Sequence, residues 1–462
     1  GETMGLFQLN GSGMTHYLKE LMPSSIHDIN AMVALYRPGP MESIPEYIKR
    51  KHNHALIRYL DPRMKDILDQ SFGVITYQDD VMAIAIQLAG YSWLEADKLR
   101  KAMGKKIPKE MEAQKTKLLE GFVKNGLIPK KAQELWELIE PFAAYGFNKA
   151  HAASYGLVAY QTAYMKANYP VEYMTAIMTA ESGDIEKVAE IINECKKMKI
   201  EVLPPDVNES FGGFTVINGS DKETDRAIRF GLYNIKNLGT DIANAIIEER
   251  KVGGKYKSLE NFFERINHKN LNKKSVEALA KSGSMDTLAE RNMIIGNLET
   301  LLSFNKESRD TGNQDSLFGE IGGVKANLSL TKRQEVGLKE KLVWEKELLG
   351  LYISGHPLDE YREKIEKFGT LIKKIKTEGK VGLPVTVACI IDDIRIVTTK
   401  NNNRMAFVRL SDFSDSIDAV IFNGLFEKSK DLLIKDTIIA LQGKITERNG
   451  EKSIAIDNLK KI

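Results

Sequence analysis

The chain has 462 residues, of which 42% are hydrophobic and 28% charged, so it can bury several cores in about two to four domains. No apolar run approaches the about 20 residues of a membrane span, and the two widely separated cysteines argue against a disulfide scaffold or structural zinc. With a net charge of only +3, any nucleic-acid binding must come from local basic patches, and a cytoplasmic location is expected.

The first elements are short helical patterns over residues 7–36, which end at a rigid turn, Arg37-Pro38-Gly39-Pro40. A basic run, Arg50-Lys51-His52, follows it. A β-branched segment then leads into a helix predicted from Val81 to Ala89, preceded by Asp79 and Asp80. These acids could bind a metal, but acids at a helix start are favoured by its dipole, and we expect capping.

The next segment, ADKLRKAMGKK, concentrates positive charge between residues 96 and 106. Gly104 is predicted to interrupt the helix, so that the basic pairs on either side, Arg100-Lys101 and Lys105-Lys106, can converge on one anion. A solvated basic helix face is the alternative.

Residues 145–170, YGFNKAHAASYGLVAYQTAYMKANYP, predict a turn and then a long helix that Tyr169-Pro170 ends. At about 100° per residue, the polar residues and the apolar residues form two opposite stripes. With Lys149, the polar stripe is expected to face a phosphate and a base, and the apolar stripe a core. An amphipathic helix with a solvated polar face is the alternative. The polar stripe is His151, Tyr155, Thr162 and Lys166; the apolar stripe is Leu157, Tyr160 and Tyr164.

The run from Tyr145 to Tyr155 resembles the fingers signature of bacterial DNA polymerase III alpha subunits, the C-family replicative polymerases. The RPGP turn with its basic run, the LRKAMGKK segment, PPDVN at 204–208 and SGHPL at 354–358 also resemble family sequences. In LRKAMGKK, Lys101 stands where the family carries Arg, which keeps the charge but loses bidentate geometry. The resemblance implies a grip on the phosphates of an incoming deoxynucleoside triphosphate by Arg100, Lys101, Lys105, Lys149 and His151.

A strand predicted over 228–232, the pentapeptide Ile-Lys-Asn-Leu-Gly at 235–239 and a helix over 243–250 resemble a helix-hairpin-helix module. Such a hairpin holds a DNA phosphate with backbone amides, here at Lys236 and Gly239, and Asn237 tolerates the left-handed conformation. A second candidate unit spans 271–283. Helical hairpins without a DNA role are the alternative.

Residues 305–331 are polar and contain glycines, which predicts a linker. Within it, Gln314, Leu317 and Phe318 resemble the sliding-clamp-binding pentapeptide of the family, and adjacent exposed Leu and Phe need a docking partner. Gly355-His356-Pro357 is interpreted as a structural turn, after a strand-like segment that ends at Gly355.

From Pro384 onward the pattern changes to five strands, predicted over 385–397, 404–410, 417–422, 437–446 and 452–456, with a helix near 425–433. This order is expected of an oligonucleotide/oligosaccharide-binding (OB) barrel. Barrels of this kind hold single strands by stacking and cationic contacts, or serve only as protein scaffolds. The candidate DNA-binding residues are Arg395, Lys400, Arg404 and Phe407.

The sequence therefore predicts a multidomain protein, with mainly α-helical fingers and a helix-hairpin-helix region followed by a small all-β OB-fold domain. The predicted domains are fingers at 1–208, the hairpin region at 209–304, a linker with the clamp motif at 305–378 and the OB fold at 379–462.

The resemblance implies template-directed DNA synthesis as part of a longer subunit, of which the chain would be a C-terminal portion truncated at Gly1. The expected partners are primer-template DNA, deoxynucleoside triphosphates, the beta sliding clamp and other DNA polymerase III holoenzyme subunits. The palm sequences that carry the catalytic aspartates do not occur in the chain, so Mg²⁺ is expected on residues outside it and the fragment alone is expected to be inactive. A non-catalytic DNA-binding or clamp-adaptor protein is the alternative.

Overall fold

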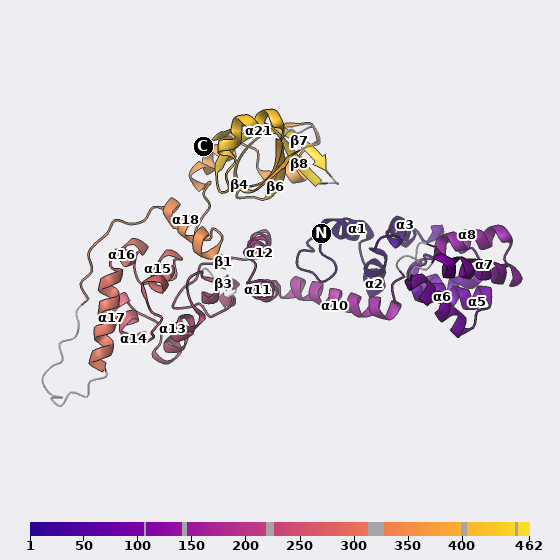
Figure 1. Cartoon of the computed structure of the whole chain (residues 1–462), viewed down its shortest axis with the longest axis horizontal. Coiled ribbons are helices and arrows are strands. Elements are labelled where there is room, and N and C mark those ends of the chain that lie inside the picture. Colours follow the sequence, from indigo (N-terminus) through magenta and orange to yellow (C-terminus); the bar gives the residue numbers. More distant parts are fainter. Residues whose placement is uncertain (106–107, 141–145, 219–225, 313–327, 399–403, 449–450) are drawn as a thin grey trace. The chain divides into compact units, whose positions relative to one another are not determined.

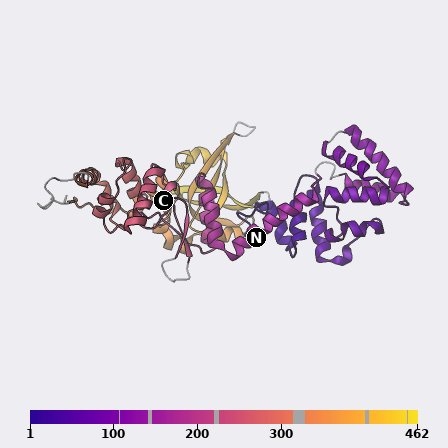
Figure 2. The ribbon, with the colours of Figure 1, turned by 90° about the horizontal axis from the view of Figure 1, so that it is seen from below.

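The computed structural model describes residues 1–462 except 106–107, 141–145, 219–225, 313–327, 399–403 and 449–450. The chain divides into two compact units, Gly1–Met174 and Thr175–Ile462. None of the helices in the described part combines the length and apolar character needed to cross a membrane. Figures 1 and 2 show the helices of the first unit in indigo to magenta and the C-terminal strands of the second unit in yellow.

The first unit is helical, as predicted, and its core is formed by apolar side chains from every main helix. The long helix α10 packs against α2, and α5 packs against α6 and α7. The expected end of α10 before Pro170 is confirmed, because Tyr169 caps it. The helices are α1 (Ser12–Leu21), α2 (Ile26–Leu35), α3 (Ile44–His52), α4 (Lys65–Leu68), α5 (Gln78–Ala89), α6 (Trp93–Lys105), α7 (Pro108–Lys124), α8 (Pro129–Ile139) and α10 (Lys149–Asn168), with 3₁₀ turns at Pro40–Ser43, His54–Leu56, Pro62–Met64 and Asp69–Ser71.

The second unit begins with helices around a small sheet, in which β3 pairs parallel to β1 and antiparallel to β2. Helix α11 (Pro170–Ala180) carries the chain across the division between the units. The strands are β1 (Val202–Leu203), β2 (Thr215–Asn218) and β3 (Arg226–Arg229), and the helices are α12 (Ile185–Lys197), α13 (Thr240–Gly253), α14 (Leu259–Arg265), α15 (Lys273–Lys281), α16 (Arg291–Ile295), α17 (Leu298–Gly312), α18 (Leu338–Leu349), α19 (Arg362–Phe368) and α20 (Ile372–Glu378), with 3₁₀ turns at Leu232–Asn234 and Asp359–Tyr361.

Two predictions in this region are wrong. The linker does not begin at Asn305, because α17 continues to Gly312. Asn305 is 4% exposed, and its side-chain amide donates to the carbonyls of Phe263 and Ile266 at 2.6 and 2.9 Å. The strand expected before Gly355 is also absent from the described residues around it. That segment is held instead by Glu345, which accepts from the backbone N–H groups of Ile353 and Ser354, each at 3.0 Å.

The predicted five-stranded barrel (Figure 1) is confirmed. It is closed in the order β4-β5-β6-β8-β7. Alternate residues of the strands fill its core, and Phe426 from α21 is buried among them. This alternation is the reason the strands could be read from the sequence. The elements are β4 (Pro384–Thr398), β5 (Arg404–Ser411), β6 (Ser416–Ile421), α21 (Asn423–Ser429), β7 (Ile438–Arg448) and β8 (Glu451–Lys461), with a 3₁₀ turn at Lys430–Leu432.

Candidate functional site

The start of α10 is fixed by two polar side chains. Asn148 caps the helix by accepting from the backbone N–H of His151 at 2.9 Å. Asp79, at the start of α5, accepts from the backbone N–H of Lys149 at 2.7 Å. The capping expected of the two acids is thus divided between two helices, because Asp80 accepts from the residues before its own helix while Asp79 stabilises the start of α10.

The first two turns of α10 carry an aromatic cluster, which we define as Phe7, Phe147, His151 and Tyr155. The His151 ring lies 4.0 Å from that of Tyr155 and 5.1 Å from that of Phe147, between ring centroids. Arg37 lies over Phe147, with its guanidinium carbon 5.4 Å from the ring centroid. The rigid RPGP turn signalled a fixed position for Arg37, but its partner lies about a hundred residues away and could not be read from the sequence.

The predicted division of α10 into a ligand-facing polar stripe and a buried apolar stripe is wrong beyond its second turn. Lys166 is 5% exposed, and its ammonium donates to the carbonyls of Glu2 and Met4, each at 2.9 Å. Thr162 accepts from the backbone N–H of Phe7 at 3.2 Å. The opposite stripe is the exposed one, with Leu157, Tyr160 and Tyr164 each about half exposed.

Two basic residues of α6, Arg100 and Lys101, converge on one carboxylate. Arg100 donates to Asp97 Oδ1 at 2.7 and 3.0 Å, and Lys101 Nζ lies 2.7 Å from Asp97 Oδ2. Lys101 and Arg100 lower the pKa of Asp97 below its usual value. Asp97 was missed at the sequence level, although its spacing of three and four residues from the two cations is that of helical ion pairs.

The interruption of α6 at Gly104 is also wrong, because the helix continues to Lys105. A single glycine costs a helix only about 1 kcal/mol relative to alanine, which neighbouring packing offsets. Helix α5 packs on α6, and its first turn contacts α10 through Asp79, so the two predicted phosphate-binding segments flank the same helix. The side chains of Lys105, Gln314, Leu317, Phe318 and Lys400 lie outside the described residues.

The basic run after the RPGP turn makes internal contacts. Arg50 donates to the carbonyls of Gly73 and Phe72 at 3.0 and 3.3 Å. Lys51 donates to the carbonyls of Leu21 and Met22 at 3.0 and 2.8 Å. These residues hold loops of the first unit together.

The predicted hairpin at 235–239 has the expected left-handed residue, but the Lys236 amide that was predicted to hold a phosphate is engaged within the protein. Asn237 adopts a left-handed conformation, with φ 68°, and the backbone N–H of Lys236 donates to the carbonyl of Leu348 at 3.0 Å. Gly239 is the N-cap residue of α13, with no side-chain hydrogen bond at this cap, and a methyl group added to it would meet no atom within 4 Å. The backbone there is open to a ligand. In the second candidate hairpin unit, residues 271–283, Asn272 caps α15 by accepting from the backbone N–H of Ser275 at 3.1 Å.

On the barrel, the structure brings together two of the predicted DNA-binding residues. Arg395 of β4 pairs directly with Phe407 of β5, so their side chains share one face of the sheet. Arg404 differs by an odd number of positions from Phe407 and alternates to the other face, which it shares with the buried Ala406. Arg404 is exposed because it lies at the end of its strand.

No group of three or more His, Cys, Asp or Glu side chains among the described residues could hold a metal ion. Asp79 and Asp80, the carboxylates considered for this role, are engaged by backbone N–H groups at two helix starts. The described residues therefore do not fit a Mg²⁺ site.

Comparison with known proteins gives three family matches along the chain. Residues 1–126 match the bacterial DNA polymerase III alpha subunit finger domain, residues 199–293 a helix-hairpin-helix motif, and residues 385–462 an OB-fold nucleic acid binding domain. Along the chain, a match to a polymerase finger domain is thus followed by a match to a helix-hairpin-helix motif and by one to an OB-fold domain.

Three relatives, each named DNA polymerase III subunit alpha, align with almost the whole chain. The protein of Borreliella burgdorferi is 40% identical over 470 residues, which is 100% of this chain and 40% of the relative. The proteins of Aquifex aeolicus and Thermus aquaticus are 38% and 39% identical, over 97% and 92% of this chain and 37% and 35% of their own length. The chain belongs to the family of bacterial DNA polymerase III alpha subunits, and it spans about 40% of the length of these relatives.

Proposed function

We propose that the chain supplies the nucleotide grip, the DNA-binding modules and the clamp anchor of a replicative DNA polymerase alpha subunit. The observation that carries the nucleotide grip is the convergence of Arg100 and Lys101 on the single carboxylate of Asp97. Two cations already aimed at one pair of oxygens are arranged for an anion of similar size, such as one phosphate of a triphosphate.

The start of α10 supports the same role from a second helix. Lys149 and His151 lie in its first turn, where the helix dipole favours an anion, and Arg37 lies nearby over Phe147. The aromatic cluster fixes the His151 ring, so that a phosphate would meet an ordered donor. The reaction of the full-length alpha subunit would be nucleotidyl transfer, with Mg²⁺ held by residues that this chain does not contribute.

The test uses a full-length alpha subunit that carries these residues. Arg100→Ala removes hydrogen bonds to a charged group, worth about 1.5 to 3 kcal/mol, and should lower kcat/KM for the nucleotide by roughly ten- to a hundredfold. Lys98→Ala is the matched control, since Lys98 is an exposed cation of the same helix. Equal loss in both variants, or no loss in Arg100→Ala, would refute the grip.

The hairpin is proposed to bind the phosphate backbone of DNA, and the barrel is proposed to bind a single strand. Gly239 leaves room for a phosphate at the open start of α13, which supports a backbone contact without base readout. Arg395 and Phe407, side by side on one sheet face, suit the phosphate and base of a single strand. Phe407→Ala should weaken single-strand binding without changing duplex binding, as measured by fluorescence anisotropy.

Gln314, Leu317 and Phe318 remain the proposed clamp anchor on the strength of the sequence. Burying one such apolar side chain is worth about 1.5 to 3 kcal/mol, so Leu317→Ala with Phe318→Ala should abolish a short linear contact. An Asp315→Ala, Ser316→Ala variant is the control, and equal clamp affinity in the two double variants would contradict the anchor. The adaptor alternative predicts DNA and clamp binding without any role for Arg100 in nucleotide use.

A further inference from the structure

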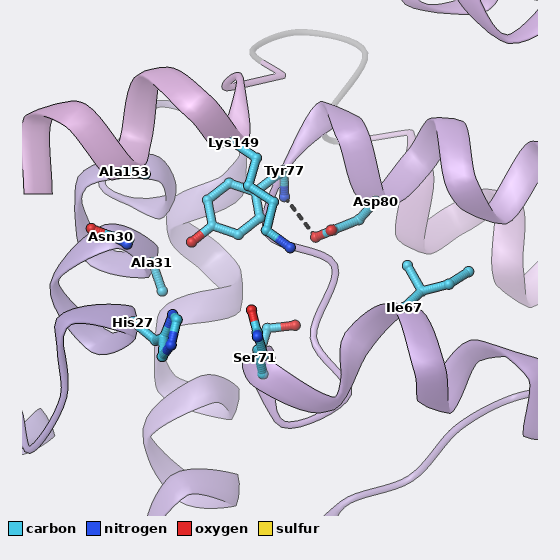
Figure 3. Close-up of a pocket in the computed structure, with 10 residues that line it drawn as sticks. His27, Asn30, Ala31, Ile67, Ser71, Tyr77, Asp80, Lys149 and Ala153 are labelled. Carbon is cyan, nitrogen blue, oxygen red and sulfur yellow. Dashed lines mark hydrogen bonds between the residues drawn. The ribbon is translucent and has the colours of Figure 1, made fainter. Parts of the chain in front are cut away.

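A small cavity lies beside the start of α10, between this helix, α2 and α5 (Figure 3). Its volume is about 130 Å³. An engineered cavity of about 150 Å³ holds one benzene molecule, so the space is of the size of a single six-membered ring and smaller than a whole nucleotide. Its lining residues are His27, Asn30, Ala31, Ile67, Gln70, Ser71, Tyr77, Asp80, Lys149 and Ala153.

The cavity has an aromatic wall and small apolar sides. Tyr77 is 8% exposed, and the Lys149 ammonium lies 5.6 Å from the centroid of its ring. Ala31 and Ala153 face the space from α2 and α10 without filling it. A flat ring can therefore lie against these walls.

The edge of the cavity carries a hydrogen-bond donor on one side and a hydrogen-bond acceptor on the other. Asn30 is 9% exposed, and its Oδ1 is buried without a hydrogen-bond partner against Gly156 of α10. Figure 3 shows its amide nitrogen turned toward the cavity as a donor. On the other side, both backbone hydrogen bonds of Asp80 end on Oδ2, so Oδ1 is the oxygen that a ligand would meet.

We infer that this cavity binds the ring of a pyrimidine base, with cytosine the better fit. The amino group of cytosine would donate to the Asp80 carboxylate, a pairing that proteins also use on cytosine in DNA. Its ring carbonyl would accept from Lys149 or from the Asn30 amide, and the ring would stack on Tyr77. This arrangement places a donor of the ligand at the Asp80 oxygen that accepts neither of the two backbone hydrogen bonds from Thr76 and Tyr77.

The base can come from two sources with the same chemistry. A free base could enter directly, or a single strand could present one base turned out of its stack, as enzymes that act on bases require. Because the cavity is smaller than a whole nucleotide, a phosphate-free probe tests it separately from the nucleotide grip of Arg100 and Lys101.

The experiment measures saturation-transfer NMR of cytosine with the 462-residue chain, with adenine as the two-ring control. Cytosine should bind in the millimolar range, and adenine should bind at least tenfold more weakly. Ala153→Leu places a larger side chain at the cavity and should weaken cytosine at least tenfold. Ala150→Leu is the matched control, because Ala150 is exposed on the same helix and does not line the cavity, and it should leave binding unchanged.

An excess of an eight-nucleotide oligodeoxycytidylate identifies the source. Loss of the cytosine signal supports a base presented by a strand, and persistence of the signal supports a free base. No cytosine signal, equal signals from cytosine and adenine, or equal binding by the Ala153→Leu and Ala150→Leu variants would overturn the inference and leave a cavity that holds only water.

Discussion

The carboxyl group of Asp80 is predicted to destabilise the first unit at neutral pH. Asp80 is 4% exposed, and burial raises its pKa from 3.8 to about 6, although the N–H groups of Thr76 and Tyr77 and the charge of Lys149 act in the opposite direction. Between these two pKa values the folded state binds more protons than the unfolded state. Stability therefore falls as the pH rises from about 4 to 6, and the full cost is present above that range.

The magnitude follows from the shift. Raising the pKa from 3.8 to about 6 lowers the free energy of unfolding by about 3 kcal/mol once the carboxyl is fully ionised, at about 1.4 kcal/mol for each pKa unit. Asp80→Asn keeps an oxygen for the two backbone N–H groups and removes the charge. We expect it to raise the free energy of unfolding by about 1 to 3 kcal/mol at pH 8 and to have little effect at pH 3.5.

The assay is urea unfolding followed by tryptophan fluorescence in a Trp344→Phe background. This background leaves Trp93 and Trp136 as reporters, both in Gly1–Met174, and Trp136 is 2% exposed.

Asp79→Asn is the matched control of opposite sign, because it removes a charge that stabilises the start of α10. It should cost about 0.3 to 1 kcal/mol. If Asp80→Asn destabilised the unit equally at both pH values, burial would not be the dominant influence on this carboxyl.

Four further outcomes are expected. Burial lowers the pKa of His356 to about 4, below the 6.5 of the free side chain. The free energy of unfolding of the second unit should therefore fall by about 2 kcal/mol between pH 7.5 and pH 5. Hydrogen exchange should show this fall, and His356→Asn should remove it. Asn237→Gly should be tolerated, whereas Asn237→Val should cost about 1 to 2 kcal/mol in urea unfolding because φ is positive there. Glu345→Ala should cost about 3 to 5 kcal/mol, since Glu345 and its partner Arg291 are 0% and 1% exposed, and the exposed Glu347→Ala should leave stability unchanged. Lys166→Met should cost about 1 to 3 kcal/mol in unfolding, with no change in nucleotide KM of a full-length subunit.

Local features of the fold were predictable because their causes lie close together in the sequence. The barrel strands alternate between buried and exposed positions, and α10 begins at a capping Asn148 and ends before Pro170. The left-handed residue of the hairpin is Asn237, as the pentapeptide predicted. Each of these signals lies within a few residues of the structure it determines.

Features that depend on distant partners were not predictable. The buried side of α10 is decided by its contacts with α2 and with residues 2–7, and Gly156 allows the close approach of Asn30. The aromatic cluster joins Phe7 to Tyr155 across about 150 residues, with ring centroids 5.2 Å apart. A helical wheel gives the angle between two stripes of a helix, but it does not say which stripe packs against the rest of the protein.

The two ends of α10 consequently have different physical roles, although their lysines look alike in the sequence. Lys166 is buried and satisfies the carbonyls of Glu2 and Met4, so its charge is unavailable to a ligand. Lys149 is exposed, and its ammonium lies over the Tyr77 ring and close enough to Asp80 for its charge to lower the pKa of that carboxyl. An ammonium in that position loses less solvation on meeting a phosphate than a buried one, and the helix dipole adds to its attraction. The ligand contacts that we propose for α10 are therefore confined to its first two turns, beside the cavity and the aromatic cluster.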